Sequence, residues 1–210
     1  MYFMNKHADI ERLSLLFSEV YPYLAHYITD KYGFKTGYCL DIGAGAGLLG
    51  ISLAKITDLS IVSIDDDSAS IDITVKNILF EGLAHRMTVI ETDVYYIPFV
   101  DNSFDLIVSR GSVFSWQDLP GAIKEMYRVL KPGGKIFCGG GLGSREISMR
   151  IQQAIKADPL FKKVRNRWRE EPYIRDKGQN TAYFVNAIAA TGLKGSVIFD
   201  CEGIWIEISK

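Results

Sequence analysis

Five short apolar runs between residues 38 and 139 constrain the fold of this chain more than any other feature. We expect strands at residues 38–42, 59–64, 87–91, 104–109 and 135–139, and helices at 48–56, 68–80 and 119–130. The last of these helices is stopped by Lys131-Pro132-Gly133-Gly134. Strands that alternate with helices over short connections form a parallel sheet with helices on both faces.

The flanking segments complete this sheet. Apolar residues at intervals of three and four predict an amphipathic helix over residues 9–31, bent at Pro22. Residues 145–157 and 180–190 are expected to be helical, and the glycine-rich residues 139–143 to be flexible. Two strand-like runs around Glu202-Gly203 indicate a hairpin. The predicted fold is therefore a doubly wound, Rossmann-like α/β sheet of seven strands, mostly parallel, with a C-terminal antiparallel hairpin at one edge.

Length and charge limit the organisation and the partners. A chain of 210 residues is long enough for one α/β domain with a full core and short for two. The net charge of −1 does not suggest a nucleic-acid partner or a basic membrane-binding surface. No apolar run is long enough to cross a bilayer, and the N-terminus lacks the pattern of a signal peptide. We therefore expect a cytoplasmic protein.

The cysteines and histidines show no metal-binding spacing. Cys39, Cys138 and Cys201 lie far apart within apolar runs, which predicts buried thiols in a reducing compartment. The three histidines are equally scattered, and we predict no metal. Of these, His26 is more simply a surface or capping residue than a base, and His85 lies in a loop away from the expected site.

The stretch DIGAGAGLLG, residues 41–50, follows the first predicted strand and matches two cofactor-binding patterns. Residues 45–50 satisfy G-x-G-x-x-G, the dinucleotide fingerprint, and residues 41–47 satisfy D-x-G-x-G-x-G. The first pattern would continue the strand through Gly43, where glycine is unfavourable. We therefore expect the strand to end near Ile42 and the loop to begin at Gly43, with Gly45 and Gly47 allowing close approach of a ligand.

Carboxylates follow the first two strands. Asp41 is poorly placed for a pyrophosphate, because like charges repel, and suits a cofactor that carries an amine and a sulfonium. The alternative is that Asp41 only accepts hydrogen bonds from loop amides. Asp65 is placed to bind ribose hydroxyls, with Asp66 as the alternative if the register is shifted by one. Asp67 is expected to cap the following helix.

Four ordered segments together resemble the class I S-adenosylmethionine-dependent methyltransferases, especially the subgroup of ubiquinone and menaquinone methyltransferases. The resemblance covers residues 37 to 140, and its segments are YCLDIGAGAGLLG, IVSIDDD, GLAHRMTVIETDVYYIPFVDNSFDLIVSRGSVFSW and IKEMYRVLKPGGKIF. It implies one domain: a helical lid at residues 1–36, a cofactor-binding core at 37–140, a variable acceptor-side segment at 141–194 and the closing hairpin at 195–210.

The resemblance also implies roles for individual residues. The methionine part of S-adenosylmethionine would lie on a loop of Gly43, Ala44, Gly45 and Gly47, beside Asp41. Asp65 would hold the ribose, and Asp93 with Val94 would bracket the adenine. Ser109 and Arg110 would border the methionine part and the transferred methyl group. The family has no fixed catalytic residue, and none is assigned.

The acceptor pocket is expected at the carboxyl ends of the strands. Tyr23 and Tyr27, four residues apart on one helix, and Trp116 could line it, although each could equally be an ordinary packing residue. Arg145, like Arg110, Arg167 and Arg169, could bind an acidic acceptor; the simpler interpretation of the basic run at 162–169 is a solvated helix face.

The predicted function is methyl transfer from S-adenosylmethionine to a small-molecule acceptor by in-line displacement. The alternatives are an NAD-dependent oxidoreductase with the same glycines, and a non-catalytic protein that binds S-adenosylmethionine. We expect no membrane insertion, and either a monomer or a homodimer.

Overall fold

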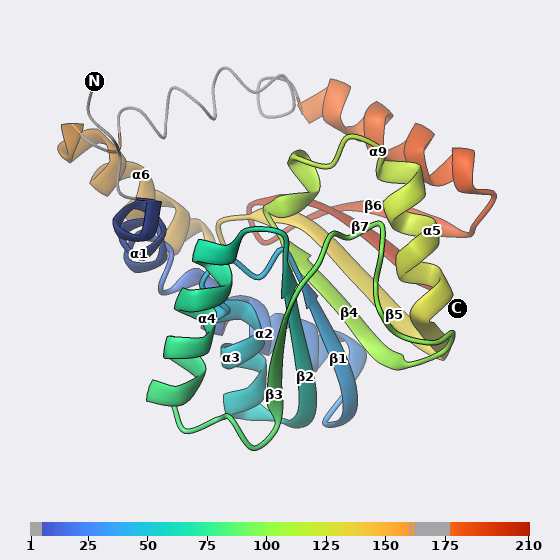
Figure 1. Cartoon of the computed structure of the whole chain (residues 1–210). Helices are drawn as coiled ribbons and strands as arrows, with labels where there is room; N and C mark the ends of the chain where they lie inside the picture. Colours follow the sequence, from blue (N-terminus) through green and yellow to red (C-terminus); the bar gives the residue numbers. More distant parts are fainter. Residues whose placement is uncertain (1–5, 160, 162–176) are drawn as a thin grey trace.

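The computed structural model describes residues 6–159, 161 and 177–210. It contains one sheet with the strand order β3-β2-β1-β4-β5-β7-β6 (Figure 1). The strands are β1 (Thr36–Ile42), β2 (Asp58–Asp65), β3 (Met87–Glu91), β4 (Phe104–Arg110), β5 (Leu130–Gly141), β6 (Gly195–Asp200) and β7 (Gly203–Ser209). The first five pair in parallel, and β7 pairs antiparallel with β5 and β6. The predicted seven-stranded mixed sheet with a C-terminal hairpin is confirmed.

Helices cover both faces of the sheet (Figure 1). Their bounds are α1 (Lys6–Leu16), α2 (Val20–Tyr32), α3 (Leu48–Ile56), α4 (Ser68–Phe80), α5 (Leu119–Val129), α6 (Arg145–Ala157) and α9 (Lys177–Thr191), with a short 3-10 helix, η1 (Ser112–Phe114). One core cluster packs α2, α3 and α6 against the sheet, and the other packs α5 and α9. The chain order reverses between β1 and β4, and the carboxyl ends of strands at such a switch point are where open α/β sheets bind their ligands.

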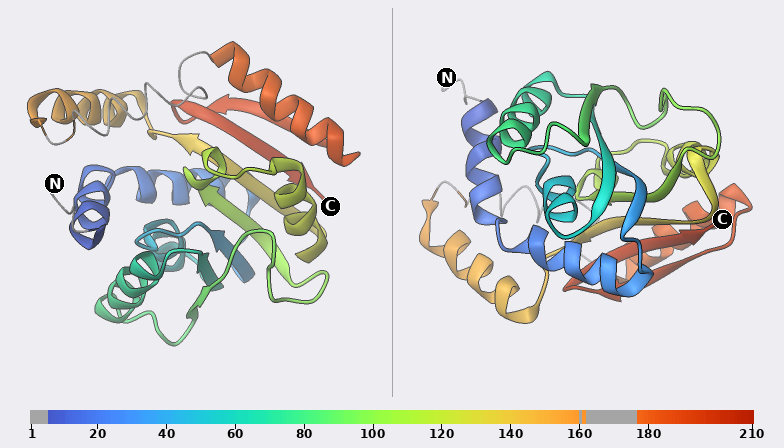
Figure 2. Two further views of the ribbon diagram at one scale, coloured as in Figure 1. Left: turned by 45° about the horizontal axis from the view of Figure 1, so that its top comes forward. Right: turned by 90° about the horizontal axis from the view of Figure 1, so that it is seen from below.

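The N-terminal segment forms two helices, so the prediction of one helix bent at Pro22 is wrong. The break falls at residues 17–19, and Pro22 lies in the first turn of α2. A continuous helix would force the Pro22 ring against the carbonyl of Ser18, whereas the first turn tolerates proline because its amides lack intrahelical acceptors. Figure 2 shows α1 and α2 running in different directions as a result.

α2 is a core helix. Val20, Leu24, Ala25 and Ile28 are completely or almost completely buried. Each large apolar side chain that leaves water contributes about 1.5–3 kcal/mol, so this face holds α2 on the sheet. α1 lies across α4 instead and packs on the core through partly buried side chains.

The glycine run at residues 139–141 is not flexible, contrary to the prediction. Gly139, Gly140 and Gly141 pair with Trp205, Ile204 and Gly203 of β7. A Cβ at Gly139 would lie 2.7 Å from the Cα of Trp205, closer than real Cβ contacts. These glycines therefore allow β7 to approach β5 closely, which is a tertiary reason for a composition that resembles a loop.

Candidate cofactor site

The glycine loop has the predicted register. β1 ends at Ile42, and Gly43, Gly45 and Gly47 all have positive φ, at 63°, 60° and 74°. Gly47 caps α3, which begins at Leu48. A dinucleotide loop that begins at Gly45 is therefore wrong for this chain, because the strand has already ended.

Gly50 has a packing role that explains the dinucleotide-like pattern. It lies in the first turn of α3, where an added Cβ would be 3.0 Å from Oδ2 of Asp41 and 3.3 Å from Ile61. Glycine therefore lets α3 approach β1 and β2 closely. The pattern G-x-G-x-x-G arises here without a dinucleotide.

α4 holds the loop from behind. Thr74 donates a hydrogen bond through Oγ1 to the carbonyl of Gly45, at 2.8 Å, and Asn77 donates through Nδ2 to the carbonyl of Ala46, also at 2.8 Å. The methyl group of Thr74 fills the space beside Gly47, so that a Cβ there would lie 2.7 Å away. The sequence analysis missed both side chains; the available signal was two hydrogen-bonding residues three apart, which lie on the same side of a helix.

Ser112 ties the loop to β4. Its Oγ lies 2.6 Å from Oγ of the fully buried Ser109 and donates to the carbonyl of Ile42 at 3.2 Å. The Ser112 side chain also occupies the space that a Cβ on Gly43 would need. Ser109 therefore supports the loop from the neighbouring strand, through a residue that the sequence analysis did not select.

Asp41 lies beneath the loop, only 2% exposed. Its Oδ2 accepts a hydrogen bond of 3.0 Å from the amide of Gly50. Burial raises the pKa of Asp41 to about 7, a shift that the Gly50 amide opposes and the nearby Asp65 carboxylate adds to. Asp41 thus contacts the amino end of α3, the contact expected under the purely structural alternative, and any role toward a ligand stays a prediction.

Asp65 ends β2 directly beside the loop. Its Oδ2 accepts from the amide of Gly45 at 2.8 Å, and its Oδ1 accepts from the amide of Asp67 at 3.1 Å. Burial raises the pKa of this carboxyl group, against the effect of the two amides. Asp67 occupies the predicted N-cap position of α4, but its side chain makes no cap hydrogen bond to the helix amides and accepts from the hydroxyl of Ser70 instead. Asp66 is exposed.

Asp93 follows β3 and lies near Asp65, because the Thr92 amide donates to the carbonyl of Asp65 at 2.9 Å. Its Oδ1 accepts from the amide of Tyr95, at 3.0 Å, in a tight turn. Val94 is buried. Asp93 is therefore fixed at the same edge of the sheet as the glycine loop, as the sequence predicts.

Arg110 ends β4 and is held on the side of α2. Its guanidinium carbon lies 4.6 Å from the ring centre of Phe17 and 5.1 Å from that of Tyr21. Nε donates to the carbonyl of Gly141 at 3.1 Å. The side chain therefore bridges the end of β5 and the junction of α1 and α2.

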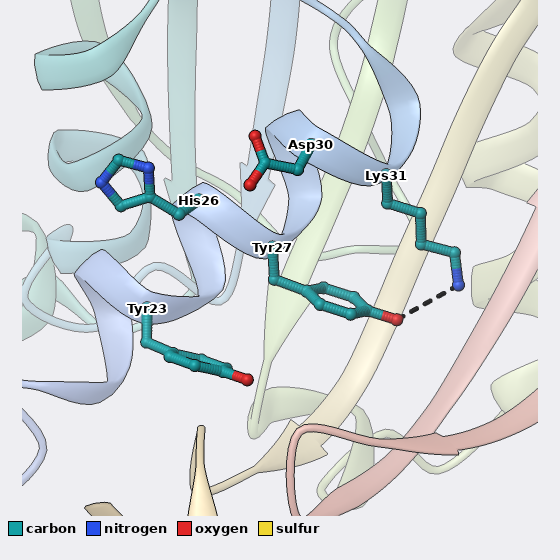
Figure 3. Close-up of a pocket in the computed structure, with 5 residues that line it drawn as sticks. All are labelled: Tyr23, His26, Tyr27, Asp30 and Lys31. Carbon is teal, nitrogen blue, oxygen red and sulfur yellow. Dashed lines mark hydrogen bonds between the residues drawn. The ribbon is translucent and has the colours of Figure 1, made fainter.

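The structure does not bring together on one surface the four residues that were proposed to line the pocket of the methyl acceptor. Tyr23 and Tyr27 project from the same side of α2 and, with His26, Asp30 and Lys31, line a shallow pocket of about 450 Å³ (Figure 3). Tyr27 donates to Oδ2 of Asp200 at 2.8 Å. Trp116 packs with the cluster on the opposite face of the sheet, and Arg145 is exposed at the start of α6. Arg167 and Arg169 lie outside the described residues.

The three cysteines are buried and free, as predicted. His85 contacts the carbonyl of Gly82 before β3, at the end of the sheet remote from the loop. Among the described residues, no group of three or more His, Cys, Asp or Glu side chains could hold a metal ion. None of the described helices is long and apolar enough to cross a membrane.

The geometry defines a class of protein: a doubly wound α/β protein with a glycine loop at the carboxyl end of β1, beside the switch point of its sheet. Gly45 has positive φ, and no atom lies within 4 Å of the position of an added Cβ. The loop is therefore open on this side. Carboxyl groups at the ends of β2 and β3 suit the hydroxyls and amine of an adenosine better than a pyrophosphate.

Comparison with known proteins identifies the family. A methyltransferase-domain family matches residues 40–138. The crystal structure of a proposed S-adenosyl-L-methionine-dependent methyltransferase from Methanococcus maripaludis has a TM-score of 0.87 and 38% identity, over 97% of this chain and 91% of that one. The chain belongs to the class I S-adenosylmethionine-dependent methyltransferase family.

Curated relatives match about half of the chain. A sterol 24-C-methyltransferase of Aspergillus fumigatus is 36% identical over 110 residues, which are 52% of this chain and 29% of that protein. A demethylmenaquinone methyltransferase of Lactobacillus johnsonii is 32% identical over 109 residues, which are 50% of this chain and 45% of that protein. The chain thus matches less than half the length of either relative.

Proposed function

We propose that this protein transfers a methyl group from S-adenosylmethionine to a small-molecule acceptor. The observation that carries the proposal is the open loop at Gly45, between the carboxylate of Asp65 and the end of β4. The loop has room for a ligand to approach its backbone, and its neighbours can bind the polar parts of an adenosine cofactor.

Asp65 keeps the capacity to bind a ribose. Each of its carboxylate oxygens accepts one backbone amide, and an ionised oxygen can accept two hydrogen bonds. Two hydroxyl groups can therefore still donate to it. The amides of Gly45 and Asp67 fix the orientation of the carboxylate before any ligand arrives. Asp66 is the alternative ligand, and its exposure at the same strand end leaves it accessible.

The remaining roles follow from the same arrangement. Gly43, Ala44, Gly45 and Gly47 would carry the methionine part of the cofactor, with Asp41 beneath them. Asp93 would accept a hydrogen bond from the adenine amine beside Val94. The hydrogen bonds from α4 engage the carbonyls of Gly45 and Ala46 and hold the loop from the side of that helix.

The bound cofactor supplies a methyl group that is already activated by its sulfonium. The chain then has to align the acceptor with that methyl group and keep water away from it. An acceptor hydroxyl or an acidic C–H group would also have to lose a proton, which requires a base, whereas a neutral amine can attack through its lone pair. We assign no catalytic residue.

The acceptor would enter over the ends of β4 and β5. Of the N-terminal segment, α1 is the proposed lid, because the buried face of α2 holds α2 in the core. The segment 141–194 would complete the acceptor side. Tyr23, Tyr27 and Arg145 would lie on one side of the entrance and Trp116 on the other. The relatives of this chain include a sterol 24-C-methyltransferase and a demethylmenaquinone methyltransferase, which supports a small organic acceptor. The cytoplasmic location, and the choice between monomer and homodimer, stay predictions.

Titration calorimetry with S-adenosylmethionine, S-adenosylhomocysteine and NAD tests the cofactor. We expect the first two to bind with one site per chain and NAD not to bind. Binding of NAD without binding of either adenosyl compound would overturn the proposal. Turnover is then tested with a panel of quinols and sterols, by measuring S-adenosylhomocysteine. Cofactor binding without turnover on a broad panel would favour the non-catalytic alternative.

A further inference from the structure

Arg110 is a half-buried cation for which the described residues supply no carboxylate partner. It lies at the carboxyl end of β4, over the rings of Phe17 and Tyr21. Nε donates to the carbonyl of Gly141 at 3.1 Å, and Nη1 donates to the hydroxyl of Tyr21 at 3.4 Å. Within the part of the chain that the structure describes, no carboxylate lies within ion-pair distance of it.

Other half-buried arginines show what a structural role requires here. Arg128 pairs with Glu125 at 2.7 Å and with Asp101 at 3.0 Å. Arg86 donates to carbonyls that include those of Thr57 and Ala54 at the end of α3. Arg110 differs from both. Of the five N–H groups of its guanidinium, two donate to the acceptors described above. The remaining donors include both on Nη2.

Partial removal of an unpaired charge from water costs free energy. The groups around Arg110 orient its guanidinium but do not neutralise its charge. The two aromatic rings and the carbonyl of Gly141 fix the guanidinium plane through cation–π contacts and one hydrogen bond. A guanidinium that is fixed in this way can bind a carboxylate or a phosphate through two parallel hydrogen bonds. The geometry therefore matches an anion site more closely than a structural ion pair.

The position of Arg110 in the sheet indicates whether the anion that it binds belongs to the cofactor or to the acceptor. The glycine loop follows β1, whereas the Arg110 side chain reaches from β4 to the end of β5, away from β1. Tyr23 of α2 lies against Gly143, just after β5, on the same side. This region lies beyond the methionine part of the proposed cofactor, where the acceptor would be.

We propose that Arg110 binds the acidic group, a carboxylate or phosphate, of the acceptor, and not the methionine part of the cofactor that the resemblance places beside it. This inference rests on the proposed function and narrows its substrate class to acidic small molecules. The other carboxylate that could reach Arg110 is the amino-acid carboxylate of the cofactor, so the experiment must separate the two.

The first measurement is calorimetric binding of S-adenosylhomocysteine and of methylthioadenosine, which lacks the amino-acid part, to the wild type and to Arg110→Gln. We expect the substitution to change both affinities by less than about threefold, because neither ligand should depend on Arg110. A loss of tenfold or more for S-adenosylhomocysteine, with methylthioadenosine unchanged, would place Arg110 on the cofactor and overturn the inference.

The second measurement uses benzoate, with benzamide as its neutral match, added to the complex with S-adenosylhomocysteine. We expect the wild type to prefer benzoate by about tenfold, the usual scale of one charge-assisted hydrogen-bonded contact. Arg110→Gln should abolish this preference. Arg110→Lys should keep part of it, because lysine retains the charge and loses the planar fork. Equal affinity for the two probes in the wild type would refute the inference.

Two controls complete the design. Lys35→Gln removes one exposed positive charge before β1, at the opposite end of the sheet, and should leave the preference for benzoate intact. Thermal unfolding of each variant shows whether the fold is kept. If the wild type does not bind S-adenosylhomocysteine, the proposed function fails. If it binds S-adenosylhomocysteine and does not distinguish benzoate from benzamide, this inference alone fails.

Discussion

The buried carboxyl group of Asp41 accepts a hydrogen bond of 3.0 Å from the amide of Gly50, one helical turn after the glycine loop. This contact joins the end of β1 to the start of α3 and spans the loop from below. Gly50 permits the approach, since a Cβ there would lie 3.0 Å from the same carboxyl oxygen. The conformation of the loop therefore depends on Asp41, a carboxyl group whose pKa is raised to about 7 by burial.

Asp41→Asn should change how stability depends on pH. Burial raises the pKa of Asp41 from its usual 3.8 to about 7 in the folded protein, so the folded state holds more protons than the unfolded state between these values. Wild-type stability should therefore fall as pH rises from about 4 to 7, relative to the asparagine variant, with a slope approaching about 1.4 kcal/mol per pH unit. Urea unfolding of both proteins at several pH values measures this difference. Parallel pH profiles would show that Asp41 titrates normally.

Gly43→Ala and Gly45→Ala form a matched pair, because both glycines have φ near +60°. Alanine at position 43 would overlap the side chain of Ser112 and should cost roughly 2–4 kcal/mol of stability. Alanine at position 45 meets open space and should cost about 1–2 kcal/mol. Chemical denaturation measures both.

Gly45→Ala should also weaken S-adenosylhomocysteine binding by about tenfold or more, because its methyl group would project into the proposed cofactor space. Calorimetry on the folded variant measures the loss. Wild-type affinity would mean that the cofactor does not lie against this glycine.

Thr74→Val tests how α4 supports the loop. Valine keeps the shape of threonine but cannot donate to the carbonyl of Gly45, so stability should fall by about 1–2 kcal/mol. Cofactor affinity should fall too, since the loop is less firmly held. Thr88→Val, at an exposed position of β3, is the control and should change stability by less than about 0.5 kcal/mol. Similar losses in the two variants would argue against the support role.

Asp93→Ala tests the placement of the adenine. Loss of a charge-assisted hydrogen bond should weaken S-adenosylmethionine binding by about 1–3 kcal/mol. Because Asp93 also orders the turn at Tyr95, circular dichroism must first show that the variant is folded. Unchanged affinity in a folded variant would mean that the adenine lies elsewhere.

Asp66→Ala is the companion variant. Asp66 is exposed, and Asp65 makes the contacts with the loop, so this substitution should leave cofactor affinity within about twofold of the wild type. A loss as large as that of Asp93→Ala would assign the ribose to Asp66 instead. Calorimetry under identical conditions compares the two.

Much of the cofactor site could be predicted because it is encoded locally. A strand end, three glycines that need positive φ and carboxylates at successive strand ends are all visible in the linear order of residues. Parallel strands bring their carboxyl ends to one edge, so the predicted residues converge there without knowledge of the packing. The alternation of strands and helices determined the parallel part of the sheet in the same way.

The acceptor side could not be predicted to the same extent. Tyr27 and Trp116 have similar sequence character, yet they pack on opposite faces of the sheet. Residues 139–141 have the composition of a loop and form the tightest approach between β5 and β7. These outcomes depend on contacts between residues far apart in the chain, which leave no local periodic pattern.

The sequence by itself determined where the glycine loop begins and which strand ends carry carboxylates, because backbone conformation and strand order act over short distances. Only the tertiary structure decided what holds that loop and what surrounds Arg110. Thr74, Asn77 and Ser112 reach the loop from other elements, and Arg110 meets the rings of Phe17 and Tyr21 about 90 residues away in the chain. The physical reason is that packing selects partners by their position in space, and residues so distant in sequence meet only when the sheet and its helices have formed.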